Sequence, residues 1–276
     1  MDVAEHSKPK KARSPELGLR ALSFLFIGIM VLIPLAVIIG DAFRQGFTEF
    51  WRQVTLPIAA SAIWLTLWTS AVMTAINAVM GLVTAFVLVR YEFPGKGLLN
   101  AIIDLPLAIP TLVTGVMLVI LYGPQESLGA FLSGQGLDII FAPPGIILAV
   151  LFITFPFVVR SIQPVLLDLD LQQERAAATL GAGGFTIFRR IILPALALPT
   201  LSGSLLSFAR AVGEFGAIVI VAGNIPFKSQ TAAVYVLGAV ESDNRLAASA
   251  VSIVLIAISL TIILFTNFVI RRGARR

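Results

Sequence analysis

The sequence has no cysteine, a single histidine and few charged residues, and each scarcity narrows the possible functions. Without cysteine there is no disulfide, no thiolate nucleophile and no zinc-thiolate site. Asp, Glu, Lys and Arg make up only 13% of the 276 residues, and the one histidine, His6, lies in a polar N-terminal tail. The nearest candidate for a phosphate-binding loop, FPGKGLL at 93–99, lacks the preceding glycine spacing and the Ser or Thr after its lysine.

Catalytic groupings are also missing within any one segment. No carboxylate pair, Ser/His/Asp set or metal-spaced cluster occurs over a short stretch of the chain. We therefore expect a protein that is not an enzyme, with no cofactor and no metal site.

What the chain has in abundance is apolar sequence. Hydrophobic residues account for 58% of it, and the mean hydropathy is +0.95. A transmembrane helix needs about 20 mainly apolar residues to cross a hydrocarbon core of roughly 30 Å. Six stretches qualify, which predicts an all-α integral membrane protein with about six transmembrane helices. The second stretch is longer than a typical bilayer requires, so as one helix it must tilt, break or project from the membrane. The predicted spans are 20–40, 57–89, 97–121, 142–159, 195–222 and 246–270.

Lysine and arginine gather on one side of these spans. Short cytoplasmic loops carry the excess of basic residues, so we expect both termini in the cytoplasm. Residues 1–19 then form a basic tail, 20–270 the membrane domain and 271–276 a basic end. Nucleic-acid binding does not fit basic clusters that are separated by apolar spans. The cytoplasmic side would hold Lys8, Lys10, Lys11, Arg13, Arg20, Arg90, Lys96, Arg160, Arg175, Arg189, Arg190 and four C-terminal arginines, and the other side Arg44, Arg52, Lys228 and Arg245.

The loop at 168–194 departs from the apolar pattern. Asp170 is placed to cap a helix that begins at residue 171, and Gly181 is placed to end it in the left-handed conformation. A second short helix is expected from Gly183–Gly184 to Pro194. One interpretation is a linker whose arginines meet anionic lipid. The other, which explains the small side chains and the glycine stop, is a helix that inserts into a groove on a partner.

Three charged residues fall inside predicted spans. Each costs something like 2.5–3.5 kcal/mol at the centre of an isolated inserted helix, so each should face protein or water. Arg210 and Glu214 are four residues apart and can pair on one helix face. A pair that only fixes helix packing and a pair that lines a pathway are equally good interpretations. Asp104, followed by Leu105–Pro106, fits a structural role near a helix break.

The loop resembles the EAA loop of permease subunits in binding-protein-dependent ABC importers. That motif has an acidic residue, two alanines, a glycine, an isoleucine and a Leu-Pro ending. The one departure is Arg175, which stands where the acidic residue usually is. The matching positions are Ala176, Ala177, Gly181, Ile191, Leu193 and Pro194, with Glu174 one place before the usual acid. The resemblance implies a type I importer fold in which this helix is a coupling helix that docks into a separate cytoplasmic ATPase subunit.

Further stretches, over roughly 64–268, are most similar to sulfate/thiosulfate permeases of the CysT type. Molybdate or tungstate permeases share similar GEFGA and AGNIP stretches and are the first alternative. A secondary transporter or channel without an ATPase is the alternative from another class, against which there is no obvious inverted repeat. The CysT-like stretches are RYEFPGKGLLNAIIDLP, LYGP, PFVVRSIQPVL and ARAVGEFGAIVIVAGNIPFKS.

The resemblance also implies a location and partners. It predicts a multi-pass protein of the bacterial inner membrane that pairs with a second permease subunit, either a CysW-type chain or a second copy. A periplasmic oxyanion-binding protein would deliver the substrate from outside. The long outer segment 223–245 can form part of the surface that receives it, with Asn224 and Lys228 as contact candidates.

Overall fold

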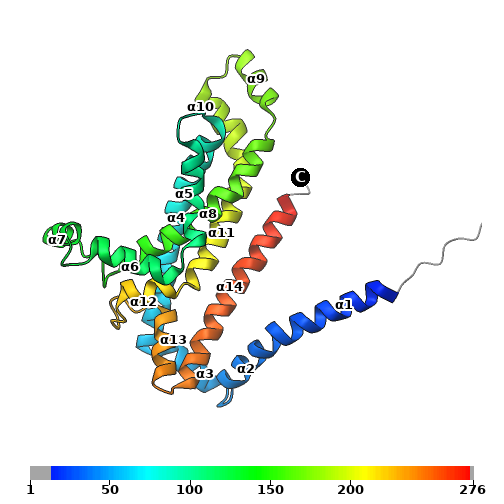
Figure 1. The fold of residues 1–276 in the computed structure, drawn as a ribbon. Coiled ribbons are helices and arrows are strands. Elements are labelled where there is room, and N and C mark those ends of the chain that lie inside the picture. The colour runs from blue at the N-terminus through cyan, green and yellow to red at the C-terminus, as the bar shows by residue number, and fades with distance from the viewer. Residues whose placement is uncertain (1–13, 274–276) are drawn as a thin grey trace, which may run out of the picture.

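The computed structural model describes residues 14–273, and within this range the chain forms helices and no strand (Figure 1). Most of the predicted basic tail and the last residues of the basic end lie outside the described residues. The helices are α1 Ser14–Ile27, α2 Ile33–Ala42, α3 Phe47–Thr55, α4 Pro57–Arg90, α5 Lys96–Ala108, α6 Thr111–Tyr122, α7 Ser127–Gly134, α8 Pro143–Asp168, α9 Leu171–Thr179, α10 Gly184–Ile187, α11 Leu193–Val212, α12 Gly216–Ala222, α13 Ala232–Glu241 and α14 Arg245–Gly273, with π-helical turns at Gly28–Leu32 and Phe188–Ile192.

Six candidate spans are present in the described chain, which confirms the predicted all-helical membrane fold. Five are helices long and apolar enough to cross a membrane, and the sixth is the bent pair α5–α6. The second span is one unbroken helix of 34 residues, α4, about 51 Å long at 1.5 Å per residue. It exceeds a hydrocarbon core of roughly 30 Å, so it must tilt or project rather than break. The five helices cover Gly18–Ala42, Pro57–Arg90, Pro143–Asp168, Gly184–Val212 and Arg245–Ile270.

The third predicted span is broken rather than continuous. Its two parts, α5 and α6, meet at an angle of 110°. Pro110 disfavours the helical conformation for the residue before it, and Ile109 is accordingly extended, with φ −81° and ψ 130°. Pro106, which we had associated with a break, lies inside α5 instead. Beyond the bend, α6 and α7 extend sideways from the bundle (Figure 1).

The fifth predicted span, 195–222, also has different bounds. The helix begins earlier, at Gly184, and ends at Val212. Gly213 follows it, and a separate short helix, α12, starts at Gly216 and packs along α6. An added Cβ at Gly216 would lie 2.2 Å from the Thr111 hydroxyl oxygen, so glycine is needed for this close approach. The GEFGA stretch is therefore a break in the span and not its continuation.

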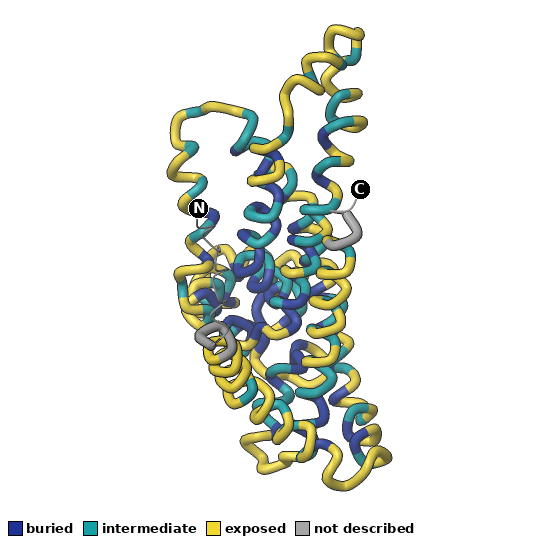
Figure 2. Tube along the Cα trace, turned by 90° about the vertical axis from the view of Figure 1, so that its right-hand side faces the viewer, coloured by how far each residue is buried: buried dark blue, intermediate teal, exposed yellow. Residues whose placement is uncertain are grey.

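The centre of the bundle is formed by α4, α8 and α11, which pack against one another. Glycine lets their backbones approach, because an added Cβ at Gly81 would lie 2.7 Å from Val158 and one at Gly203 would lie 2.8 Å from the Ser161 hydroxyl. The buried residues accordingly run along the interior of the molecule in Figure 2, where the loop that carries α9 is mostly exposed.

A small polar network joins the same three helices. The Asn77 amide of α4 donates to the Thr154 hydroxyl of α8 at 2.9 Å, and the Ser207 hydroxyl of α11 donates to the Thr154 carbonyl at 3.1 Å. All three residues are buried. These bonds pair the Asn77 amide nitrogen and the Ser207 hydroxyl, which would otherwise face apolar surroundings, and they link the three helices at fixed positions.

In the first span, α1 projects away from the bundle (Figure 1), whereas α2 packs against α14. No residue is buried in the most apolar window of this span. Large apolar side chains cover it, with Phe24 77% exposed and Val37 65% exposed. A surface of this kind suits contact with lipid or with another chain. Helix α9 lies at one end of the bundle, and α3 and the α13–α14 turn lie at the other (Figure 1).

Candidate functional site

The predicted helix in the 168–194 loop is present as α9, and its ends are set by side-chain and backbone bonds. The Asp170 carboxylate accepts a hydrogen bond from the Gln172 N–H at 2.9 Å, which caps the first turn. Gly181 has φ +84°, the left-handed conformation expected of a residue that ends a helix. The Gly181 and Ala182 N–H groups donate to the carbonyls of Ala178 and Ala177, each at 3.0 Å. This pattern is a Schellman motif, which gives the helix a defined stop.

The two faces of α9 differ in what they contact. Glu174 and Ala177 are half-buried, and the Glu174 carboxylate is paired with the guanidinium of Arg90, at the last residue of α4. The side chains of Arg90 and Glu174 are only 16% and 20% exposed. We define the outer face of α9 as the four exposed residues on the opposite side, at helical spacing i, i+3, i+4 and i+7: Gln172, Arg175, Ala176 and Thr179.

The second helix of the loop is not the separate element that we predicted. Helix α10 continues through the π-helical turn Phe188–Ile192 into α11, so the chain from Gly184 to Val212 is one span. Pro194, which has no N–H, comes directly after the π-helical turn Phe188–Ile192, where the regular α-helical hydrogen-bond ladder is already interrupted. Ile191 is half-buried, whereas Leu193 and Pro194 are exposed. These three motif residues therefore form the base of a membrane helix, not a helix standing off the surface.

Asp104 lies in a polar cluster with residues of α8, which the sequence around Asp104 did not indicate. It pairs with Arg160, which we had assigned to a loop but which lies inside α8. The Arg160 Nε donates to Asp104 Oδ1 at 2.7 Å, and its remaining N–H groups reach Asp104 Oδ2, Gln163 Oε1, and the side-chain and backbone oxygens of Asn100. A guanidinium has five N–H groups. All five are used, so Arg160 has no free donor for a ligand.

Arg210 and Glu214 are paired, as their spacing predicted, but their surroundings are unequal. The distance from Arg210 Nη1 to Glu214 Oε2 is 2.7 Å, and the two side chains are 36% and 1% exposed. Glu214 Oε1 also accepts from the Ala217 N–H at 3.1 Å, across the break between α11 and α12. The buried carboxylate thus links α11 to α12 across the break and fixes the position of Arg210. The Nε and Nη2 atoms of Arg210 make no hydrogen bond within the described chain.

The other predicted contact residues lie between α12 and α13, at the side of the bundle and nearer to α3 than to α9 (Figure 1). Asn224 and Lys228 are exposed in the connection between α12 and α13. The Gln230 amide donates to Asn224 Oδ1 at 2.7 Å, which holds Asn224 in its left-handed conformation, with φ 51°. At the end of the bundle opposite α9, on α3, hydrogen bonds from Arg52 and then Gln53 hold the pKa of the Glu49 carboxyl below its usual value.

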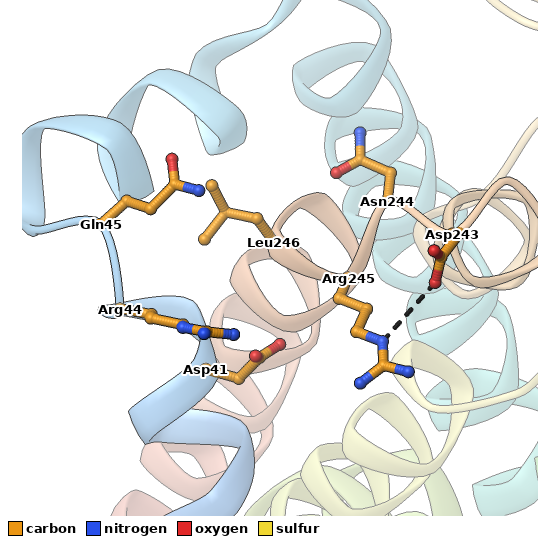
Figure 3. A pocket seen from close by; sticks show the side chains of 7 residues that line it. All are labelled: Asp41, Arg44, Gln45, Asp243, Asn244, Arg245 and Leu246. Carbon is orange, nitrogen blue, oxygen red and sulfur yellow. Dashed lines mark ion pairs between the residues drawn. The ribbon is translucent and has the colours of Figure 1, made fainter.

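The same end has a polar cavity of about 320 Å³ that the sequence did not indicate. Figure 3 shows Asp41 and Arg44, at the end of α2, directed toward Arg245 at the start of α14. The Asp41 carboxylate accepts from the Ser249 hydroxyl at 2.7 Å, and Arg245 lies 3.6 Å from Asp243. The only sequence signal was that Arg44 and Arg245 are among the few basic residues on that side. The lining is completed by Gln45, Asn244 and Leu246.

Comparisons with solved structures show the fold. A chain of a bacterial alginate ABC transporter, in complex with an alginate pentasaccharide-bound periplasmic protein, superimposes with a TM-score of 0.75 at 20% identity, over 93% of this chain and 94% of that one. A chain of the MetNI methionine ABC transporter in inward-facing conformations superimposes with a TM-score of 0.56 at 17% identity, over 78% and 95%. The helical arrangement is thus that of ABC importer permeases.

Sequence comparisons are more specific. The sulfate transport system permease protein CysT of Synechocystis sp. is 39% identical over 254 residues, 92% of this chain and 89% of that protein. CysT of Salmonella typhimurium is 37% identical over 92% of both chains, and a probable cysT protein of Nephroselmis olivacea is 40% identical over 90% and 88%. A family model matches residues 77–276. The chain therefore belongs to the family of inner membrane components of binding-protein-dependent transport systems.

Proposed function

We propose that this protein is a permease subunit of an ATP-driven importer of sulfate, and of thiosulfate as a second substrate. The observation that carries the proposal is 37–40% identity to CysT proteins over about nine-tenths of the chain. These relatives are named for sulfate transport, which favours sulfate over the molybdate or tungstate alternative. Membership of a binding-protein-dependent family likewise disfavours a secondary transporter or channel.

In this proposal α9 docks into a cytoplasmic ATPase subunit. Its outer face has short or small side chains at Ala176 and Thr179, which allow a close backbone approach, and its ends are defined by Asp170 and Gly181. The Glu174–Arg90 pair links the helix to the end of α4, a central helix of the bundle. ATP-driven movement of the partner would then shift the membrane helices and open the pathway to the other side.

The proposed membrane orientation follows from that docking. The α9 end and both termini would lie in the cytoplasm, and the α3 and α13 end would face the periplasm. Asn224, Lys228 and the polar cavity around Arg44 and Arg245 would then be available to a periplasmic oxyanion-binding protein. A second permease subunit, of the CysW type, would complete the pathway. The exposed apolar surface of the first span supports a membrane or subunit environment.

Arg210 is the residue that we propose guides the anion. A sulfate dianion is too costly to desolvate without nearby donors. Arg210 is 36% exposed and has three N–H groups, on Nε and Nη2, that make no hydrogen bond in the described chain, whereas Arg160 has none free. Because the negative charge of Glu214 offsets part of the attraction between Arg210 and an anion, the site suits passage of an anion rather than tight retention. Asp104 would serve to neutralise Arg160 and to hold α5 on α8.

Uptake of labelled sulfate in cells with and without this chain tests the proposed function. We expect uptake that requires the chain, stops when ATP is depleted at constant membrane potential, and yields to unlabelled thiosulfate before molybdate. Stronger competition by molybdate than by thiosulfate would instead support the molybdate or tungstate alternative. Uptake that continues without ATP would contradict the importer mechanism.

Substituting Arg210 tests the pathway role. Loss of one charge-assisted contact to an anion corresponds to about 1.5–3 kcal/mol, so Arg210→Gln is expected to lower sulfate uptake roughly tenfold or more. Arg210→Lys retains the charge and should retain most of the uptake. A charge swap is a poor control, because an arginine at position 214 cannot accept the Ala217 N–H bond. Unchanged uptake per folded molecule in Arg210→Gln would show that the pair serves packing alone.

A further inference from the structure

The outer face of α9 carries one full charge, and it is positive. Arg175 is exposed, and its guanidinium makes no hydrogen bond or ion pair within the part of the chain that the structure describes. Its neighbours on this face, Gln172, Ala176 and Thr179, are uncharged, and the Thr179 hydroxyl is bonded to backbone carbonyls of its own helix. Any partner that covers this face must therefore accommodate an unpaired cation.

Glu174, the residue before it, does not neutralise Arg175. Successive residues on a helix point about 100° apart, and the Glu174 carboxylate is held on the other side of α9 by Arg90. Asp170 is committed to the first turn through its bond to the Gln172 N–H. The nearest acids are thus used inside this chain, and none of them supplies a counter-charge to the docking surface.

We propose that the groove of the ATPase subunit that receives α9 presents an Asp or Glu carboxylate to Arg175. This inference rests on the proposed docking of α9 and adds the chemistry of the partner surface. A docked helix loses water from its outer face, and an arginine that loses its hydration without a counter-charge weakens the complex strongly. A carboxylate matches the planar guanidinium with two parallel hydrogen bonds.

Anionic lipid is the other source of negative charge, and the geometry disfavours it for Arg175. Arg189 and Arg190 are exposed at the start of the span Gly184–Val212, where phosphate headgroups can reach them. Helix α9 instead stands beyond α10 at the far end of the molecule (Figure 1). An ATPase groove therefore accounts for Arg175, while lipid accounts for the arginines of the membrane helix.

The test measures the affinity of the ATPase subunit for the assembled permease in membranes, over a range of salt concentrations. We expect Arg175→Glu to weaken binding at least thirtyfold, roughly the effect of breaking one desolvated charge pair, and to remove most of the salt dependence. Arg175→Lys should bind nearly as well as the parent chain. The matched control is Arg189→Glu, the same charge change off the outer face, which should leave the affinity within about threefold.

A second measurement identifies the acid directly. With Arg175→Lys, a carbodiimide should join the new amine to a carboxylate within contact distance, and mass spectrometry should find residue 175 linked to an Asp or Glu of the ATPase. A link to no ATPase residue, or equal loss of affinity in Arg175→Glu and Arg189→Glu, would overturn the inference and favour lipid or diffuse charge.

Failure of the inference is distinguishable from failure of the docking itself. Gly181→Val forces a β-branched residue into a left-handed conformation, whereas Gly183→Val at φ −70° meets no steric restriction and serves as its control. If Gly181→Val lowers the affinity and Arg175→Glu does not, α9 docks but its partner has no acid at this point. If neither does, the proposed coupling role of α9 is wrong as well.

Discussion

Asp104→Leu is expected to lower the free energy of unfolding by about 3 kcal/mol, the order of the cost of an unpaired arginine within a membrane helix. Asp104 lies about 12 Å into α5, counted from Lys96, and Arg160 lies about 12 Å from the end of α8. Leucine in place of Asp104 leaves the Arg160 guanidinium without its counter-charge. Thermal unfolding of the purified subunit in lipid nanodiscs, together with the yield of monodisperse protein, measures the loss.

Two further variants separate the charge from the packing. Asp104→Asn keeps one side-chain oxygen that can accept a hydrogen bond from Arg160, so it should lose less stability than leucine. Asp104→Leu combined with Arg160→Met removes both charges and should regain most of the loss, because apolar replacement of a whole ion pair is often neutral. A single Asp104→Leu variant as stable as the parent would mean that water, rather than Asp104, compensates Arg160.

Reversal of Arg90 is expected to have the largest effect on transport. Arg90→Glu sets two carboxylates against each other at a site where the parent side chains are only 16% and 20% exposed. Repulsion there should release α9 from the end of α4 and lower sulfate uptake at least about tenfold, the equivalent of 1.4 kcal/mol or more. The reversed pair, Arg90→Glu with Glu174→Arg, should recover a large part of the uptake because the attraction is restored.

The amount of sulfate moved per ATP hydrolysed separates positioning from stability. A detached α9 should let the ATPase subunit turn over with little transport, whereas a merely unstable permease should lose both in proportion. The matched control is Lys96→Glu, which disrupts the exposed Lys96–Glu92 pair close to the same end of the bundle. Exposed pairs contribute about 0–1 kcal/mol, so this variant should transport normally. Equal loss in both variants would contradict the special role of the Arg90–Glu174 link.

Much of the candidate site was predictable where it depends on neighbours in the chain. Asp170 and Gly181 set the two ends of α9, and both ends were predictable because a helix cap and a left-handed stop involve only residues within one or two turns. Arg210 and Glu214 meet for the same reason, at i and i+4. The prediction of a separate second helix was wrong, because the helix from Gly184 continues through a π-helical turn and past Pro194 to Val212.

The pairs that join distant helices were beyond such reasoning. Arg160 and Asp104 are 56 residues apart, and Arg90 and Glu174 are 84 apart, so no local pattern connects them. The positive-inside count placed Arg160 in a loop, since an arginine near the end of an apolar stretch marks a boundary unless an acid on another helix neutralises it. The 110° bend between α5 and α6 was missed because hydropathy carries no information on direction.

The sequence by itself determined that the chain crosses a membrane about six times, which segments do so, and which loop carries the capped, small-faced helix. These properties follow from transfer free energies and hydrogen bonds that each segment has on its own. Only the tertiary structure decided that Glu174 turns inward to Arg90 while Arg175 faces outward, that Arg160 is fully satisfied by its neighbours and that Arg210 is not. The pairing of a charge depends on which helices pack together and at what rotation, and that is settled by the whole bundle.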